Sequence, residues 1–279
     1  MSVYRVEAAK ASCGVSGCAC RDRTRRYPSD LTDEQWQVLE PQARARYGIE
    51  WRALPVDFPP WEAVYAFFER WSERGLPQRL VDRLRGRIRI ACGRAELPTA
   101  AVTDAQTVRG ADGAGYDTGN KTKGRKRNIA TDCLGLLLMV TVTSGGMQDR
   151  DSAHRLLALL REHFSTITLV WADGGYAGRL VTWAKAVLCL TLTVVKRADD
   201  IKGFVVLPRR WVVERTFGWL TRHRRLVRDY ERRPPHHEAM VWWATVTIMT
   251  RRLARELAGT PPPPRWGQPR PSRDLKPAA

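Results

Sequence analysis

The order of strand and helix patterns from about residue 98 onward limits the possible folds more than any other feature of the sequence. Ala100–Val108 alternates in polarity as a half-buried strand does, and Arg125–Thr131 and Leu136–Thr143 predict two more strands. A helical pattern over Asp151–Phe164 is followed by a strand pattern over Thr166–Ala172. Three successive strands followed by alternating helices and strands are typical of a mixed α/β sheet with helices on both faces.

The remaining patterns extend this arrangement. They predict a helix that ends at Leu188, a strand over Leu190–Val195, a long basic helix over Arg209–Arg228 and an apolar helix over Glu238–Leu257. His236 and His237 follow two prolines, so we expect them to lie in a loop. The order of elements is compatible with the ribonuclease H-like fold, and we expect an α/β domain of that kind over residues 96–258.

The first third of the chain has a different pattern. Residues 1–30 contain many small and charged residues without periodicity, so we expect a flexible extension. Apolar residues at helical spacing, such as Val64 and Phe68, predict a small all-helical domain over residues 31–95. The proline-rich residues 259–279 are expected to form a disordered tail.

The net charge of the chain indicates a polyanionic partner. The chain has 47 Lys and Arg against 29 Asp and Glu, a formal net charge of +18, and nucleic acid is the usual partner of so basic a protein. A ribosomal-type protein or an ordinary basic protein would show the same surplus, so charge alone does not decide the function. The longest apolar stretch, Met240–Met249, is far shorter than the ~20 residues of a membrane span, and we expect no membrane association.

The six cysteines do not form the pattern of a disulfide framework. Cys13, Cys18 and Cys20 are close enough in the sequence to bind zinc, but no fourth ligand lies nearby, and closed zinc sites need four. The cysteines therefore favour a reducing cytoplasm.

Asp104 and Asp173 are acidic residues within a predicted strand and at the end of another, and both positions are informative. Asp104 lies inside the strand pattern Ala100–Val108, where its charge would lose hydration unless the strand is an edge strand and the side chain faces solvent. Asp173 follows directly after a strand, and ligands bind at the carboxyl ends of strands in open α/β sheets. Gly174 and Gly175 leave room for a ligand, although an ordinary Asp-Gly turn would have the same sequence.

Glu214 is the third acid of interest because it lies in a strongly basic segment. It is next to the apolar stripe that Val213, Phe217 and Leu220 form on a predicted helix, so we expect it to point into a crevice. A positive field keeps a carboxylate ionised and ready to bind metal, whereas a simple salt bridge to Arg210 is the alternative. Acids on a strand, a strand end and a helix can converge on two Mg²⁺ ions about 3.5–4 Å apart, an arrangement that cleaves phosphodiester bonds.

Seven segments of the chain occur in the order and with the spacing of a known family. They are Ala101–Val108, Gly115–Asp117, Gly124–Arg127, Asp132–Leu136, Gln148–Asp151, Trp171–Tyr176 and Trp211–Phe217. Together they resemble the bacterial insertion-sequence transposases with a DDE triad, in the group called IS-five. The resemblance covers most of the chain, roughly residues 31–258.

The resemblance implies a DNA transposase with a ribonuclease H-like catalytic domain, in which Asp104, Asp173 and Glu214 are the catalytic and metal-binding residues. It further implies Mg²⁺ or Mn²⁺ as cofactor, with two ions per active site. The implied partners are double-stranded transposon ends and target DNA, bound by a homodimer or larger assembly in a bacterial cytoplasm, at the nucleoid. Arg210 matches the arginine of the family's last motif, whereas Leu207 stands where the family often has a tyrosine.

The N-terminal unit, which is helix-turn-helix-like and binds DNA in this family, is shorter here. The difference lies between Leu39 and Gly48. It leaves open a second interpretation, a decayed or repurposed copy that binds DNA without cleaving it. A nuclease acting on RNA–DNA hybrids is a third, which fits less well because such enzymes have a further acid.

Basic side chains near the three acids are expected to contact DNA phosphates. Five of them lie in residues 120–128, where a solvated loop is the alternative, and others follow the predicted helix of Glu214. The expected contacts are Lys121, Lys123, Arg125, Lys126, Arg127, Arg210, Arg215, Arg222 and Arg225. Trp211 and Trp219, on either side of Glu214, would stack on a displaced base or, as the pattern favours, pack in the core.

Overall fold

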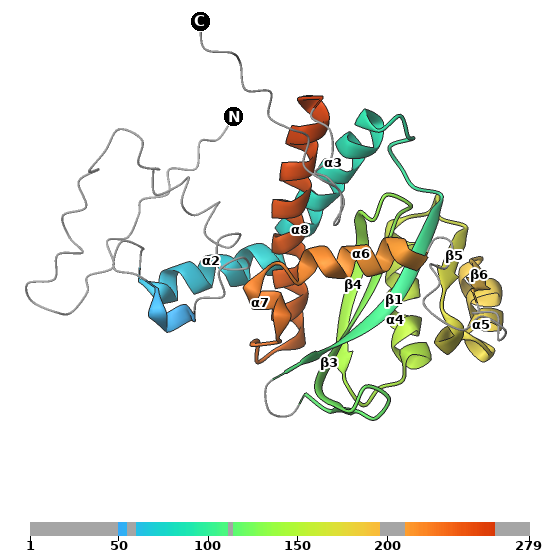
Figure 1. Cartoon of the computed structure of the whole chain (residues 1–279), viewed down its shortest axis with the longest axis horizontal. Coiled ribbons are helices and arrows are strands. Elements are labelled where there is room, and N and C mark those ends of the chain that lie inside the picture. The colour runs from blue at the N-terminus through green and yellow to red at the C-terminus, as the bar shows by residue number, and fades with distance from the viewer. Residues whose placement is uncertain (1–49, 55–59, 111–113, 196–209, 260–279) are drawn as a thin grey trace, which may run out of the picture.

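The computed structural model of the chain describes residues 50–54, 60–110, 114–195 and 210–259. The cysteines considered for zinc, the N-terminal extension, the shortened part of the helical unit and the proline-rich tail lie outside these residues. The described elements (Figure 1) are, in order, η2 (Trp51–Ala53), α2 (Trp61–Glu73), α3 (Leu76–Ala91), β1 (Ala100–Arg109), β2 (Tyr116–Asp117), β3 (Thr122–Thr131), β4 (Leu137–Ser144), α4 (Asp149–His163), β5 (Leu169–Ala172), η3 (Gly174–Tyr176), α5 (Arg179–Leu188), β6 (Thr191–Val194), α6 (Arg210–Leu220), α7 (Arg224–Val227) and α8 (Pro234–Leu257).

Strand β1 lies inside the sheet, between two neighbours. It pairs antiparallel with β3 and parallel with β5, and β6 continues the sheet beyond β5. On its far side β3 pairs with β4, and the short β2 pairs with the start of β3. This order, with helices on both faces, confirms the predicted ribonuclease H-like mixed sheet. Because β1 is not an edge strand, the alternative of an edge position for Asp104 is wrong.

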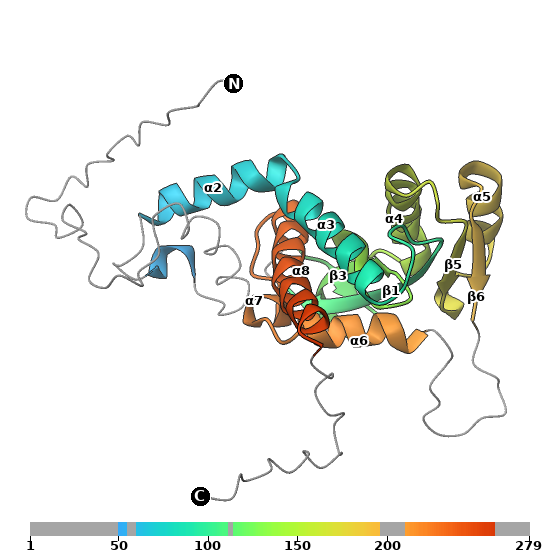
Figure 2. The same cartoon turned by 90° about the horizontal axis from the view of Figure 1, so that it is seen from above.

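Different helices cover the two faces of the sheet (Figure 2). On β3, Asn128 points to α4, where its side-chain oxygen accepts a hydrogen bond from the Ser152 hydroxyl (2.7 Å). The neighbouring Arg127 points to the opposite face and donates to a backbone carbonyl of α7 (2.9 Å). Asp104 is paired with Ile129, two residues along β3 from Arg127, so its side chain is on the face that α6 and α7 cover.

Helices α2 and α3 share one core with the sheet. Phe68 of α2 and Ile88 of α3 belong to the same buried cluster as Leu138 of β4 and Trp243 of α8. Helix α3 runs alongside α8, and both contact β4 (Figure 2). The limits of the helical and α/β domains that the sequence suggests stay predictions.

The predicted helix over Arg209–Arg228 is wrong, because α6 ends at Leu220 and α7 is a separate turn. The backbone N–H groups of Arg222 and His223 donate to carbonyls three residues earlier, which tightens the last turn and ends the helix. The break redirects the chain and buries Arg225, which a continuous amphipathic helix would leave on the same flank as Glu214.

Helix α8 begins earlier than expected, at Pro234 instead of Glu238, and its first turn contains His236 and His237. Proline suits this position because the N–H groups of a first helical turn have no partner within the helix. The predicted loop at the two histidines is therefore wrong. Although α8 has 24 residues, neither it nor another described helix has the length and apolar character to cross a membrane.

A buried ionic network joins β3 to the start of α8. Arg125 donates to the Asp229 carboxylate (2.7 Å), which also bonds with Nδ1 of the fully buried His237 (2.9 Å). Burial lowers the pKa of His237 despite the neighbouring carboxylate. Burial alone would raise the pKa of Asp229, but the bond with His237 and the charge of Arg125 hold that pKa below its usual range.

The free energy of unfolding is expected to fall on acidification below the ordinary histidine pKa of 6.5, because the unfolded chain then binds a proton that buried His237 does not accept. One such proton changes stability by up to about 1.4 kcal/mol per pH unit. Asp229 adds to the loss only below its ordinary pKa of 3.8. Urea unfolding at about pH 7.5 and about pH 5.5 measures the decrease in the free energy of unfolding between the two pH values, and this decrease should be smaller for His237→Gln than for wild type. An equal decrease in both proteins would show that His237 is not the group responsible.

Candidate active site

The register between β1 and β5 brings Asp104 and Asp173 to the same level of the sheet. The parallel ladder ends with the pair Val102 and Trp171. Asp104 is two residues after Val102, and Asp173 is two residues after Trp171, just past the carboxyl end of β5. Neighbouring strands lie about 4.8 Å apart, so the two acidic residues stand next to each other at this edge.

Both carboxylates are half-buried and bound by local backbone groups. Asp104 Oδ1 accepts a hydrogen bond from the N–H of Ala105 (2.8 Å). Asp173 Oδ1 accepts one from the N–H of Gly175 (3.0 Å) and caps η3, so residues 173–175 do form an Asp-Gly turn. A Cβ at Gly174 would meet no atom within 4 Å, so the turn leaves open space for a ligand.

Tyr176 lies beneath the same edge. Its side chain is fully buried, and the Thr103 side chain is the hydrogen-bonding group nearest its hydroxyl. Burial raises the pKa of this hydroxyl well above its usual value, and the charges of Asp104, Asp149 and Asp173 raise it further. The three carboxylates therefore all lie within electrostatic reach of this hydroxyl.

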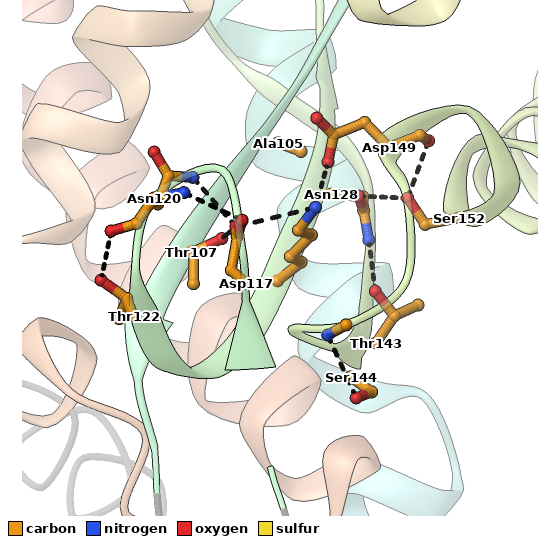
Figure 3. Close-up of polar contacts among 12 residues, drawn as sticks. Ala105, Thr107, Asp117, Asn120, Thr122, Asn128, Thr143, Ser144, Asp149 and Ser152 are labelled. Atoms are coloured by element: carbon orange, nitrogen blue, oxygen red, sulfur yellow. Dashed lines mark hydrogen bonds and ion pairs between the residues drawn. The ribbon is translucent and has the colours of Figure 1, made fainter. Parts of the chain in front are cut away.

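Asp149 is a residue of this edge that the sequence analysis did not single out. It is the first residue of α4 and forms an ion pair with Lys126 of β3 (2.9 Å; Figure 3). A Cβ at Gly175 would lie 3.8 Å from Asp149 Oδ2 and 3.2 Å from Asp173 Oδ1, so both carboxylates line the same small space. The signal was in the strand order: β4 runs parallel to β1 and β5, so the helix that follows β4 begins at the edge where those strands end.

Glu214 lies on α6, on the face of the sheet to which Asp104 points, but its side chain is exposed. The expected crevice is wrong, because Val213 and Phe217 take the buried stripe and the flank of the helix beside them is uncovered. Among the described residues, no group of three or more His, Cys, Asp or Glu is close enough to hold a metal ion. The structure thus brings Asp104 and Asp173 together and leaves Glu214 apart.

The paired carboxylates have the chemistry of a Mg²⁺ or Mn²⁺ site. Mg²⁺ prefers oxygen ligands and is commonly held by one or two carboxylates together with water and substrate phosphates. Asp104 and Asp173 supply two carboxylates, and the buried hydroxyl of Tyr176 lies within electrostatic reach of both. The residues present therefore fit a divalent cation.

Helix α6 is held to the sheet through the turn between β3 and β4. The two residues after Glu214 make the contact: Arg215 donates to the Leu134 carbonyl (3.0 Å) and the Thr216 hydroxyl to the Gly135 carbonyl (2.8 Å). Gly135 has φ +76°, and a Cβ there would lie only 3.0 Å from Thr216 Oγ1, so this close contact requires glycine. The turn therefore fixes where α6 sits on the sheet.

Trp211 and Trp219 stack on Arg215. The guanidinium carbon lies 4.5 Å from one ring centroid and 4.8 Å from the other, an attractive arrangement of a cation between two aromatic faces. Trp211 is 41% exposed, so the predicted core position is wrong for this residue, and Trp219 is half-buried. The stack stiffens the flank of α6 beside Glu214.

Comparison with protein families agrees with the sequence motifs. Residues 96–249 match the family described as transposase DDE domain, and residues 42–81 match a family described as putative transposase of the IS4/5 family. The first match covers more than half of the chain. This chain belongs to the DDE transposase family. The resemblance to insertion-sequence transposases is thereby confirmed.

Among solved structures, the transposase is similar to the one titled "Crystal structure of the Mos1 Strand Transfer Complex". The two share 12% sequence identity over 85% of this chain and 81% of that chain, with a TM-score of 0.32. This likeness is too distant to bear on the site. No curated protein matches the sequence.

The basic residues expected to contact DNA have different surroundings in this transposase. Those with exposed side chains are Lys121, Lys123 and Arg222. Those buried against protein groups are Arg125, Lys126, Arg127 and Arg225. Arg215 is stacked between tryptophans, and the side chain of Arg210 lies outside the description. Phosphate contact by residues 125–127 does not fit their burial, because strand β3 turns each of these cations to a partner inside the protein.

Thr216→Val is expected to lower the free energy of unfolding by about 1–3 kcal/mol, because the Gly135 carbonyl loses a buried hydrogen bond. Thr250→Val is the matched control. Both hydroxyls also donate to the carbonyl four residues earlier in their own helix, but Thr250 is exposed and its hydroxyl donates within α8 instead of to the turn. Its replacement should therefore lower the free energy of unfolding by no more than about 0.5 kcal/mol. Equal losses in urea unfolding would show that the bond to the turn contributes nothing.

Proposed function

We propose that this transposase cleaves DNA at the ends of its transposon and transfers the released strand into target DNA. The observation that supports this most is that Asp104 and Asp173 stand side by side at the carboxyl end of parallel strands, in a chain of the DDE family. Glu214, on the helix that the β3–β4 turn holds, is the third acid. Water first opens a phosphodiester at the transposon end, and the released 3′-hydroxyl then attacks the target.

Asp104 and Asp173 would hold Mg²⁺ or Mn²⁺, with Glu214 completing the second of two ion positions. Bound ions of this kind neutralise charge on the scissile phosphate and activate the attacking oxygen. The protein brings the two carboxylates to one edge, where Asp104 and Asp173 each accept a backbone hydrogen bond that orients them. Because Glu214 is exposed, it joins the pair only once α6 moves toward β5 in a complex with DNA and metal.

Double-stranded DNA is the proposed partner, both as terminal inverted repeats and as target. The exposed cations Lys121, Lys123 and Arg222 support phosphate binding, which is the salt-dependent part of DNA affinity. Two transposon ends have to be brought together for transposition, so we propose a homodimer or larger assembly on DNA. A bacterial cytoplasm, at the nucleoid, is the compartment that supplies such a substrate.

A second function is favoured by one observation, the exposed position of Glu214. A protein that retains Asp104 and Asp173 but never closes α6 onto them would bind DNA without cutting it. Such a protein would be the decayed or repurposed copy that the shortened N-terminal unit also suggests.

Glu214→Gln is expected to reduce Mg²⁺- or Mn²⁺-dependent nicking of a labelled duplex that carries the flanking inverted repeats by at least about 100-fold, because a metal-binding charge is lost. DNA binding should remain. Glu162→Gln, an exposed position near the end of α4, is the matched control and should cleave as wild type does.

Two other outcomes would change the proposal. Nicking retained by Glu214→Gln would remove this residue from the site. Binding without nicking by the wild-type chain, with either metal, would establish the second function in place of the first.

Replacing Lys121 and Lys123 together by Gln is expected to weaken DNA binding by a similar factor for every sequence. The slope of log K against log salt should become less steep by about 0.9 for each phosphate that the variant no longer neutralises. Lys185→Gln, an exposed lysine on α5, is the control and should leave the slope unchanged. Fluorescence anisotropy at several salt concentrations measures the slope, and an unchanged slope in the double variant would exclude both lysines from the DNA surface.

A further inference from the structure

Asp149 stands beside the turn of Asp173 and has no part in the triad. Its two carboxylate oxygens face different ways. Oδ1 forms the ion pair with Lys126 Nζ (2.9 Å), while Oδ2 faces the turn of Asp173, 3.8 Å from the place of a Cβ on Gly175. One oxygen is therefore anchored to β3, and the other borders the space that Asp173 also borders.

The anchor of Asp149 is rigid. Lys126 is buried, with its ammonium group between Asp149 (2.9 Å) and Asp117 (3.7 Å). Asp117 is in turn held by the Thr107 hydroxyl and by the backbone and side-chain N–H groups of Asn120 (Figure 3). This chain of contacts runs through β1, β2, β3 and α4, so the position of the Asp149 carboxylate is fixed by the sheet.

The dipole of α4 does not by itself explain why an acidic residue stands at position 149. A carboxylate in the first turn is favoured by the helix dipole, but the exposed Asp151 supplies one in the same turn of α4. Asp149 instead adds a charge to the space that the Asp173 carboxylate also borders, which is unfavourable unless a cation offsets it.

Lys126 offsets one of the three charges of Asp104, Asp149 and Asp173. The fully buried Tyr176 hydroxyl lies within electrostatic reach of all three carboxylates. The local surplus of negative charge at this edge matches a divalent cation.

We propose that Asp149 is a fourth carboxylate of the divalent-cation site, which binds the ion through its coordinated water, and that Lys126 holds it in place. This inference rests on the proposed function. It does not invoke direct ligation, because no three acidic groups in the described ranges are close enough to share an ion. Mg²⁺ keeps several of its waters when bound to proteins, and carboxylates beyond the direct ligands raise metal affinity by accepting hydrogen bonds from such groups.

Calorimetric titration of Mn²⁺ into the full chain without DNA tests the proposal. Asp149→Asn keeps the shape of the side chain, removes its charge and should weaken Mn²⁺ binding on the order of 10-fold, the lower end of the range for such outer partners. Asp151→Asn is the matched control, the same substitution in the same turn, and should bind as wild type does. Asp149→Glu retains the charge and should bind Mn²⁺ more tightly than the Asn variant.

The titration of Asp104→Asn separates failure of this inference from failure of the proposed function. Wild-type Mn²⁺ binding by Asp104→Asn would overturn the metal site itself. Weak binding by Asp104→Asn combined with wild-type binding by Asp149→Asn would overturn only the role of Asp149. Equal weakening by Asp149→Asn and Asp151→Asn would also overturn it, because the effect would then be one of general charge. The Asp149 side chain is 38% exposed, and thermal melting verifies that each variant is folded before titration.

Discussion

The parallel pairing of β1 with β5 is the constraint on which the rest of the site depends. Its register is held by apolar side chains such as those of Ala101 and Val170, which are fully buried and face each other in the ladder. A slip by one residue would turn every side chain of a strand to the opposite face of the sheet and expose such residues. Because the core forbids this slip, Asp104 and Asp173 stay at one level. Burial of apolar residues thus sets the geometry of two charged ones.

The positive charges of the chain serve two separate purposes. Arg125 and Arg127 on β3 lie inside the protein and tie the strand to the segments around α7 and the start of α8. Desolvation offsets much of the attraction in a buried ion pair, but loss of one partner leaves an unpaired buried charge and costs about 3–5 kcal/mol. Such pairs therefore select one arrangement of strand and helices more than they add stability. The run of cations that stands out in the sequence is largely interior, so under the proposed function DNA contacts a different set of side chains.

Local signals in the sequence were sufficient for the sheet and for two of the acidic residues. Alternating polarity depends only on the strand itself, and the position of Asp173 depends only on where its strand ends. Glu214 shows the limit of such signals. Each residue turns a helix by about 100°, so a glutamate beside an apolar stripe lies at the boundary between the buried and the exposed side of the helix. Whether it is covered depends on a neighbouring element of the fold, which the periodicity of the helix itself does not reveal. Asp149 was not predicted for a related reason. Its partner Lys126 is 23 positions away and the turn of Asp173 follows another strand, so no local pattern connects these residues.

The parts of the candidate site differ in how firmly they are held. Asp104 lies on a strand and Asp173 directly follows one, whereas Glu214 is on a helix that packs on β1 and β3 and is hydrogen-bonded to the β3–β4 turn. That turn is itself rigid: the buried Asp132 carboxylate accepts backbone hydrogen bonds from Leu134 and Leu136 (both 2.9 Å) and pairs with an arginine of α3.

An arginine of α8 donates to the Leu134 carbonyl as well, so three helices meet at this turn. Arg215 and Thr216 are the residues of α6 that contact it, and Glu214 is on the N-terminal side of both. Val213 and Phe217 of α6 are part of the buried core, and the helix packs on β1 and β3, so a movement of Glu214 relative to the sheet has to repack these side chains. Under the proposed function, Glu214 is drawn to the edge of the sheet only when a cation is present there, so its exposed position without DNA and metal would confine cleavage to the assembled complex.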